Sequence, residues 1–386
     1  MEDVSASDVR SGAKDIQGIP WYTKTTREEV RQRKLRNYRN RGRNIPQSGE
    51  ASDKEHKTIK KYCLYDFRWY AGSVRPFSNS LLRNMVWATS KHDVYLMSNF
   101  SAVHWSSLTC TKTEILDFSG HVVSLEKHPK SFPEGFTATR VSTFVVKDKL
   151  LLAGRLQGEL IVKYLDKPGV SFCARRPTYD DDDAITTCIE INNSASGALH
   201  FIVSYNDSGV REFDMETFQL SNYFHFNLPV NHTSLSPDGR LLVIVGDDPE
   251  GMLVDSRNGM VVSSLSGHVD YSYASAWRPD GQTFATGNED NTCRIWDIQN
   301  LSKSVTVLKG TFGPIVSISY TSDGRYMAIA EHEDFVHIFD VKSGYVVEQE
   351  IDFFGEISGV SFSPDSESLF IGVRSSAWNG VLEFGR

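Results

Sequence analysis

The sequence of 386 residues lacks long apolar runs, a secretory leader and paired cysteines. No stretch approaches the roughly 18 consecutive apolar residues that cross a membrane as a helix. The opening MEDVSASDVR is polar and acidic, so we expect no secretory signal. The five cysteines, an odd number, form no C-x-x-C pair. We therefore expect buried free thiols in a chain of the cytosol or nucleus.

Motifs that carry catalysis are also absent. The sequence has no G-x-S-x-G elbow, no P-loop and no H-E-x-x-H motif, and its cysteine spacing does not suit zinc. The densest carboxylate cluster, Asp180, Asp181, Asp182 and Asp183, lacks the central Gly and the distant Glu of an EF-hand loop. We predict no catalytic residue, no metal site and no cofactor, and expect that the chain is not an enzyme.

Charge is distributed unevenly along the chain. Residues 1–61 hold 15 Lys and Arg against 9 Asp and Glu, whereas the remainder holds 26 against 40. Residues 24–43 alone carry nine basic and two acidic side chains. Thr25 or Thr26 can cap a helix over this basic stretch, which should end near Gly42. A basic arm thus precedes an acidic body.

The rest of the arm divides into three expected parts. We expect residues 1–15 to be disordered and residues 46–57 to form a polar linker. Trp21 and Tyr22 stand just before the predicted helix, and large aromatic side chains favour a segment that is anchored to the body.

A unit of turns and short strands recurs through the second half of the chain. Polar turns return every 42 or 43 residues, at Ser236–Gly239, Arg278–Gly281, Thr321–Gly324 and Ser363–Ser366. The last apolar residue of a strand recurs with a similar spacing, at Phe213, Val254, Trp296, Phe339 and Phe384. An Asp follows four of these five residues. Because three short strands cannot close a core alone, the units must pack against one another.

The best-preserved unit opens with Gly267-His268 and closes with Trp296-Asp297. This pattern resembles the WD-repeat family of β-propellers, and the resemblance covers about residues 62–386. It implies a hydrogen-bonded tetrad that braces the blade, formed by His268, Thr286, Asp290 and Trp296. Asp207 and Asp248 stand at the position of Asp290 in two other units.

The expected fold is therefore all-β: a seven-bladed WD-repeat β-propeller, residues 62–386, preceded by a basic helical or disordered arm, residues 1–61. The last unit supplies only three strands, and a blade has four. We predict that residues 62–68 provide the missing outer strand and close the ring, which removes exposed sheet edges. The segment Gly310–Gly313 stands where a Gly-His pair is expected and Glu333 replaces the turn Asp. Most blades should therefore rely on packing.

In WD-repeat propellers the turns between the second and third strands and the links between blades lie on the same face. By this likeness we predict an acidic partner-binding face that includes Asp180, Asp181, Asp182, Asp183, Asp247, Glu289 and Glu331. Either a basic segment of another protein or the chain's own arm could bind there. A separate determinant in the arm, for an acidic partner or an import receptor, comprises Arg31, Lys34, Arg36 and Arg39.

The chain is also similar to a little-characterised group of plant and fungal WD-repeat proteins, with which it shares DIQGIPW, HVDYSYASAWRPDG and FGEISGVSFSPD. The resemblance implies a non-catalytic interaction scaffold in the nucleus and cytoplasm that binds regulatory proteins such as transcription or transport factors. One alternative is a substrate receptor of a cullin-type ubiquitin ligase, although no strand ends in the complete W-D-x-R/K pattern of such receptors. A further alternative is nucleic-acid association through the arm, which the acidic body opposes. We expect no membrane contact.

Overall fold

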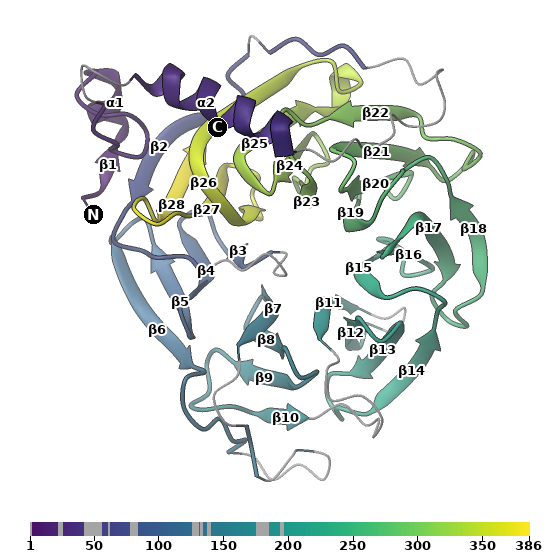
Figure 1. Cartoon of the computed structure of the whole chain (residues 1–386). Coiled ribbons are helices and arrows are strands. Elements are labelled where there is room, and N and C mark those ends of the chain that lie inside the picture. Colours follow the sequence, from purple (N-terminus) through teal and green to yellow (C-terminus); the bar gives the residue numbers. More distant parts are fainter. Residues whose placement is uncertain are drawn as a thin grey trace.

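Antiparallel sheets radiate around a central axis and form a closed ring (Figure 1). The computed structural model describes residues 2–21, 26–41, 56–60, 62–77, 84–125, 131, 134–136, 140–174, 185–193 and 197–386. The turns predicted from Pro, Asp and Gly join consecutive strands into hairpins. Gly281, for example, has a φ of +69°, a conformation that glycine adopts without a steric penalty.

Five sheets have four strands each, and we refer to them as blades one to five. Blade one comprises β3 (Val86–Ala88), β4 (Asp93–Ser98), β5 (Ser101–Ser106) and β6 (Thr111–Asp117). Blade two comprises β7 (Val141–Lys147), β8 (Leu150–Arg155), β9 (Leu160–Tyr164) and β10 (Phe172–Ala174). Blade three comprises β11 (Thr186–Asn193), β12 (Leu199–Tyr205), β13 (Gly209–Asp214) and β14 (Leu220–His225). Blade four comprises β15 (Val230–Leu235), β16 (Leu241–Gly246), β17 (Asp248–Asp255) and β18 (Val261–Leu265). Blade five comprises β19 (Ser272–Trp277), β20 (Thr283–Asn288), β21 (Thr292–Asp297) and β22 (Thr306–Lys309).

The remaining eight strands form a continuous sheet that serves as two blades. Its members are β23 (Ile315–Tyr320), β24 (Tyr326–Glu331), β25 (Glu333–Asp340), β26 (Glu348–Phe362), β27 (Ser368–Arg374), β28 (Gly380–Gly385), β2 (Asp66–Ala71) and β1 (Val4–Ser5), and a short 3₁₀ helix, η1 (Val341–Ser343), follows β25. The first half of β26 pairs with β25 as the outer strand of blade six, and its second half pairs with β27 as the inner strand of blade seven. Gly355 lies between the two halves with a φ of +141°, and a Cβ there would lie 2.7 Å from the carbonyl oxygen of Arg374.

The inner strands of successive blades contact one another in a complete circle, β3, β7, β11, β15, β19, β23 and β26. This arrangement confirms the all-β propeller and is consistent with seven blades. Apolar side chains fill the space between neighbouring blades. Ile295 of blade five, for example, packs with Ile329 of blade six in a cluster of buried residues.

The ring is closed by β2, which pairs antiparallel with β28 as the outer strand of blade seven. The predicted closure by an N-terminal strand is confirmed, but the strand begins later than the predicted residues 62–68. Leu64 and Tyr65 instead donate their backbone N–H groups to the side chain of Gln349, and the Tyr65 hydroxyl donates to the carbonyl of Ser366. These residues therefore tie the two halves of the long sheet together before β2 starts.

The expected disorder of residues 1–15 is wrong for the part that the structure describes. Strand β1 adds an edge to β2, and the Val4 side chain is buried in the blade-seven core. The helix α1 (Ala6–Arg10) follows, and Ser5 and Asp8 form a capping box at its start. The Ser-x-x-Asp pattern and the adjacent Val were the sequence signals of this ordered edge.

The cysteines follow the expectation only in part. All five are free thiols, but Cys63 and Cys110 are exposed whereas Cys173, Cys188 and Cys293 are buried. Among the residues that the structure describes, no helix has the length and apolar character needed to cross a membrane.

Candidate protein-interaction face

Blade five contains the predicted tetrad as a chain of hydrogen bonds. His268 Nδ1 lies 3.0 Å from Asp290 Oδ2, His268 Nε2 lies 2.9 Å from Thr286 Oγ1, and Trp296 Nε1 donates to the same hydroxyl at 2.9 Å. Burial lowers the pKa of His268 despite the hydrogen bond to Asp290, so the imidazole is neutral and its two nitrogens can serve as donor and acceptor. The group braces the blade through contacts among its own side chains.

The two other turn aspartates share one kind of contact with Asp290, and Asp207 also forms an ion pair with Arg211. Asp207 Oδ1 accepts from the backbone N–H of Gly209, and Asp248 Oδ1 accepts from that of Glu250. Asp290 makes the same contact with Thr292. The shared position therefore reflects a shared turn, and no other described blade repeats the full tetrad.

Blade six replaces the tetrad with a buried charged group. Glu331 accepts backbone N–H bonds from Thr311, Phe312 and Gly313 at 2.6, 2.8 and 2.5 Å, so the segment that lacks a His supplies donors from its backbone. His337 Nε2 lies 2.8 Å from Glu331 Oε1. The prediction that Glu331 belongs to an exposed partner-binding face is wrong, because its side chain is fully buried.

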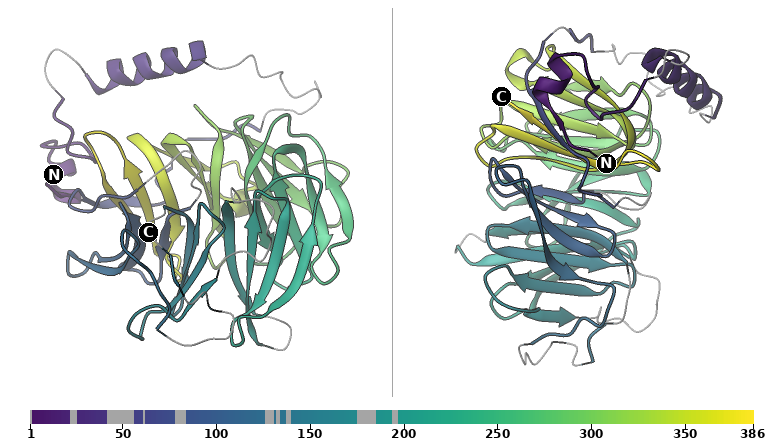
Figure 2. Two further views of the ribbon diagram at one scale, coloured as in Figure 1. Left: turned by 60° about the horizontal axis from the view of Figure 1, so that its bottom comes forward. Right: turned by 90° about the vertical axis from the view of Figure 1, so that its left-hand side faces the viewer.

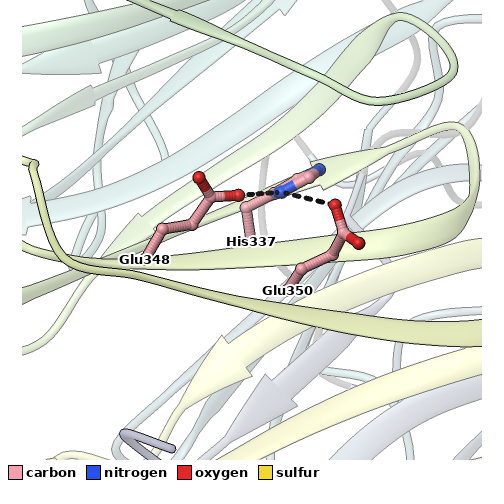
Figure 3. Close-up of side chains that lie close together, drawn as sticks. All are labelled: His337, Glu348 and Glu350. Atoms are coloured by element: carbon pink, nitrogen blue, oxygen red, sulfur yellow. Dashed lines mark hydrogen bonds and ion pairs between the residues drawn. The ribbon is translucent and has the colours of Figure 1, made fainter. Parts of the chain in front are cut away.

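On its other side, His337 meets Glu348 and Glu350 (Figure 3). The ligand atoms of these three residues lie within 4.8 Å of one another. Burial alone would lower the pKa of His337, but the hydrogen bonds with Glu331 and Glu348 outweigh it and raise the pKa to about 9. A metal ligand must be a neutral imidazole, and here the ammonium of Lys60 already lies 2.6 Å from Glu350. The donor set therefore fits a buried ion-pair network and does not fit a metal site.

The helix α2 (Arg27–Arg41) lies over one flat face of the ring, above blade six (Figure 2). Its predicted cap is present: Thr26 Oγ1 accepts from the N–H of Glu29, and the Glu29 carboxylate accepts from the N–H of Thr26. Three basic side chains on one side of α2, at spacings of four and three residues, reach down to the propeller. They are Arg27, Arg31 and Lys34.

Arg31 is the central contact and is only 3% exposed. Its Nη1 donates to Asp334 at 2.6 Å, and its Nη2 donates to the Asp352 carboxylate and to the carbonyl of Phe353. The guanidinium carbon lies 4.6 Å from the ring centre of Phe335 and 4.2 Å from that of Phe354. We call Asp334, Asp352, Phe335 and Phe354 the arginine pocket.

Arg27 and Lys34 flank the arginine pocket. Arg27 Nη2 lies 2.9 Å from Asp352, and Lys34 Nζ lies 3.0 Å from Glu333 and 2.8 Å from Asp334. The predicted arm residues therefore separate into two groups. Arg31 and Lys34 bind the chain's own carboxylates, whereas Arg36 is exposed and, among the residues that the structure describes, donates to the carbonyl of Gln32 alone. The side chain of Arg39 lies outside the described residues.

A segment before α2 anchors the arm. The Gln17 side chain forms two hydrogen bonds with the backbone of Phe354, donating at 2.9 Å and accepting at 2.6 Å. Trp21 donates to Asp15 at 2.7 Å, and its ring lies 5.4 Å from that of Phe354. Trp21 thus has the anchoring role that the sequence favours, while Tyr22 lies outside the described residues.

The turns between second and third strands meet the links between blades on this same face. The N–H of Asp247 donates to Pro229, and the N–H of Glu289 donates to Tyr271. Asp247 and Asp248 are exposed and Glu289 is half-buried. Residues 180–183 lie outside the described residues.

The inner strands enclose a cavity of about 760 Å³ on the axis of the ring. Several of its polar groups bind one another or the backbone: His232 contacts Ser275, Lys147 donates to the carbonyl of Ile191, and Glu190 accepts from the N–H of Leu235. Burial raises the pKa of Glu190 to about 7. These contacts serve to join neighbouring blades.

Sequence reasoning missed the acceptors of the arm. Asp352, Phe353 and Phe354 lie in β26 just before Gly355, where the strand passes from blade six to blade seven, and only the folding back of α2 gives them a role. Asp334 could have been found from the sequence, because it directly follows Glu333, which stands at the position of the turn Asp in its repeat. It adopts a φ of +74° and is fully buried.

Comparisons with known proteins agree with this geometry. The family description "WD domain, G-beta repeat" matches residues 259–297, the unit with the tetrad. The THO complex subunit 3 of Arabidopsis thaliana is 25% identical over 39% of this chain and 47% of its own length. An uncharacterized protein of Schizosaccharomyces pombe is 25% identical over 44% of this chain and 55% of its own. The chain spans about half the length of the first curated relatives that it matches.

A chain in the crystal structure of the mitotic checkpoint complex has a TM-score of 0.63 and 14% sequence identity, and the alignment covers 89% of this chain and 96% of that one. The fold and the blade-five tetrad thus define a β-propeller of the WD type. The chain is a WD-repeat protein. Proteins of this family typically serve as non-catalytic interaction scaffolds.

Proposed function

We propose that the chain is a non-catalytic adaptor that binds basic segments of regulatory proteins at the face beneath α2. The observation that carries the proposal is a group of exposed carboxylates on blade four, at the turn between β16 and β17 and just after it. They are Asp247, Asp248 and Glu250. None of the three forms an ion pair with another residue that the structure describes. With the surplus of acidic residues in residues 62–386, they create a potential that attracts Lys and Arg side chains.

The partners that we propose are transcription or transport factors in the nucleus and cytoplasm. The names of two relatives support a nuclear setting. One is the THO complex subunit 3, and the other is a component of chromatin assembly factor 1 of Gallus gallus, which is 24% identical over 44% of this chain and 34% of its own. Association with nucleic acid through the arm is less favoured, because Arg27, Arg31 and Lys34 already neutralise carboxylates of the propeller.

The test is affinity purification from nuclear and cytosolic fractions with three forms of the full chain. The first is unmodified, and the second carries Asp247→Lys, Asp248→Lys and Glu250→Lys. The matched control reverses three exposed carboxylates at hairpin turns of the opposite face, with the substitutions Asp166→Lys, Glu216→Lys and Asp280→Lys.

We expect partners that are retained by the unmodified chain and the control to be lost from the blade-four variant. Partners retained equally by all three forms would refute the proposed face. If ubiquitin-ligase adaptor proteins dominate the retained fraction, the substrate-receptor alternative takes the place of the adaptor.

A further inference from the structure

The arginine pocket is built for a guanidinium group rather than for any cation. Two carboxylates and a carbonyl accept hydrogen bonds from Arg31, while the rings of Phe335 and Phe354 lie close to its planar group. A guanidinium is flat and weakly hydrated, so it can satisfy both requirements together. A lysine ammonium carries the charge but has no planar face that can lie against the two rings.

The pocket also requires a cation for its own stability. Asp334 is fully buried, and its protein contacts apart from the arm include the N–H of Gly355 at 2.8 Å. A buried carboxylate without a counter-charge is costly, so some cation must occupy the pocket when the propeller is folded. In this structure the cation is supplied by α2.

The contacts that fix α2 to the propeller are polar, and one of its buried donors is not hydrogen-bonded. None of its described side chains belongs to the apolar core clusters that line the propeller. Arg31 Nε is buried and has no hydrogen-bond partner among the described residues, which leaves a desolvated donor. Arg27 and Lys34 are about one-third exposed, so solvent and salt screen their ion pairs.

The segment before α2 is attached to the propeller by contacts that involve no ion pair. Gln17 binds the backbone of Phe354, and Trp21 packs on the Phe354 ring. These contacts do not depend on Arg31. The helix can therefore leave the arginine pocket while the anchor keeps it close to the propeller.

We propose that the arginine pocket recognises an arginine side chain in a basic segment of a partner protein, and that α2 is a tethered competitor for this site. The proposal rests on the proposed function, because it adds a specific subsite to the same face. A short tether gives α2 an effective concentration on the order of 1 mM. Only a partner segment that binds more tightly than this competitor displaces it.

The probe is a labelled synthetic peptide that copies residues 26–41, TREEVRQRKLRNYRNR, added to the full chain. We expect it to bind the Arg31→Ala chain about tenfold more tightly than the unmodified chain, because the competitor no longer fills the pocket. The Arg36→Ala chain is the matched control and should behave like the unmodified chain. A second peptide with Ala in place of its Arg31 should lose about tenfold in affinity for the Arg31→Ala chain.

A second chain variant covers the case in which Arg31→Ala does not fold. The Arg27→Ala, Lys34→Ala double variant keeps a cation beside Asp334 and weakens only the flanking contacts, so it should bind the peptide about threefold more tightly than the unmodified chain. Equal affinity for all chains, or no binding up to about 1 mM peptide, would overturn the proposal. Either result, together with loss of partners from the blade-four variant, would leave the proposed function standing.

Discussion

The buried group of blade six should make the stability of the chain depend on pH in a direction that the structure determines. His337 lies between Glu331 and Glu348 at 2.8 Å on each side, and its pKa is raised from 6.5 to about 9. The folded state therefore holds a proton that the unfolded chain releases above its own pKa. This contribution is complete below pH about 6.5 and is lost as the pH rises through about 9.

The size of the effect follows from the linkage between protonation and folding. Raising the pH from about 7.5 to about 9.5 should remove about 2 kcal/mol of unfolding free energy. For a chain of 386 residues this loss corresponds to a fall in Tm of about 2–3 °C. This pH range begins above the pKa of Glu190, which burial raises to about 7. Glu190 is therefore already largely ionised where the measurement starts.

The assay is thermal unfolding followed by tryptophan fluorescence at a fixed scan rate, with the full chain and a His337→Gln variant. Burial also raises the pKa of Cys173 and Cys293, and these thiols lower the stability at high pH in the same direction. Both proteins contain the thiols, so the difference between the two pH profiles isolates His337. Identical profiles would show that His337 is neutral in the folded chain and would refute the reasoning.

Three further predictions concern the tetrad, the closure of the ring and the docked helix. Thr286→Val should cost about 2–4 kcal/mol of unfolding free energy, because His268 and Trp296 lose the hydroxyl that they share. Thr283→Val on the same strand should be close to neutral, since its hydroxyl has no partner among the described residues. Equal losses of unfolding free energy in the two variants, measured by denaturant unfolding, would count against the tetrad. Deletion of residues 62–70 should destabilise the whole ring, so that amide exchange accelerates in all blades; acceleration confined to blade seven would contradict closure by β2. Arg31→Ala should cost about 2 kcal/mol, because Asp334 and Asp352 lose the buried guanidinium and keep only the partly exposed Lys34 and Arg27 as counter-charges. Arg36→Ala should stay within about 0.5 kcal/mol, and equal Tm values for the two variants would be inconsistent with the docked helix.

Features governed by local periodicity could be predicted from the sequence. The spacing of the polar turns located the strands of blades four to seven, and the pair Gly267-His268 with Trp296 located the tetrad. The N-terminal end of α2 was also accessible, because Thr26 and Glu29 form a local cap. Each of these depends on residues that are near one another in the chain or repeat at a constant interval.

Features governed by contacts between distant segments could not be predicted in the same way. The sequence places Glu331 in a polar turn region, and only the approach of the backbone at Thr311–Gly313 shows why a carboxylate is buried there. Arg31 looks like one of several exposed basic residues until α2 is placed above blade six. Its neighbour Arg36, with the same charge and only five positions away, remains in solvent.

Blade six shows why these distant contacts belong together. It lacks the imidazole and tryptophan of the tetrad and instead buries Glu331, Asp334 and Glu348 within or beside its sheet. His337 compensates the first and third of these carboxylates, but Asp334 is compensated by cations of α2, and Lys60 assists Glu348 at 3.4 Å. These outside cations come from the first 61 residues, so the arm completes the electrostatics of a blade that lacks the tetrad. A chain that lacked the arm would therefore lose stability in blade six as well as a binding determinant, and single substitutions such as Arg31→Ala separate the two roles more cleanly than truncation does.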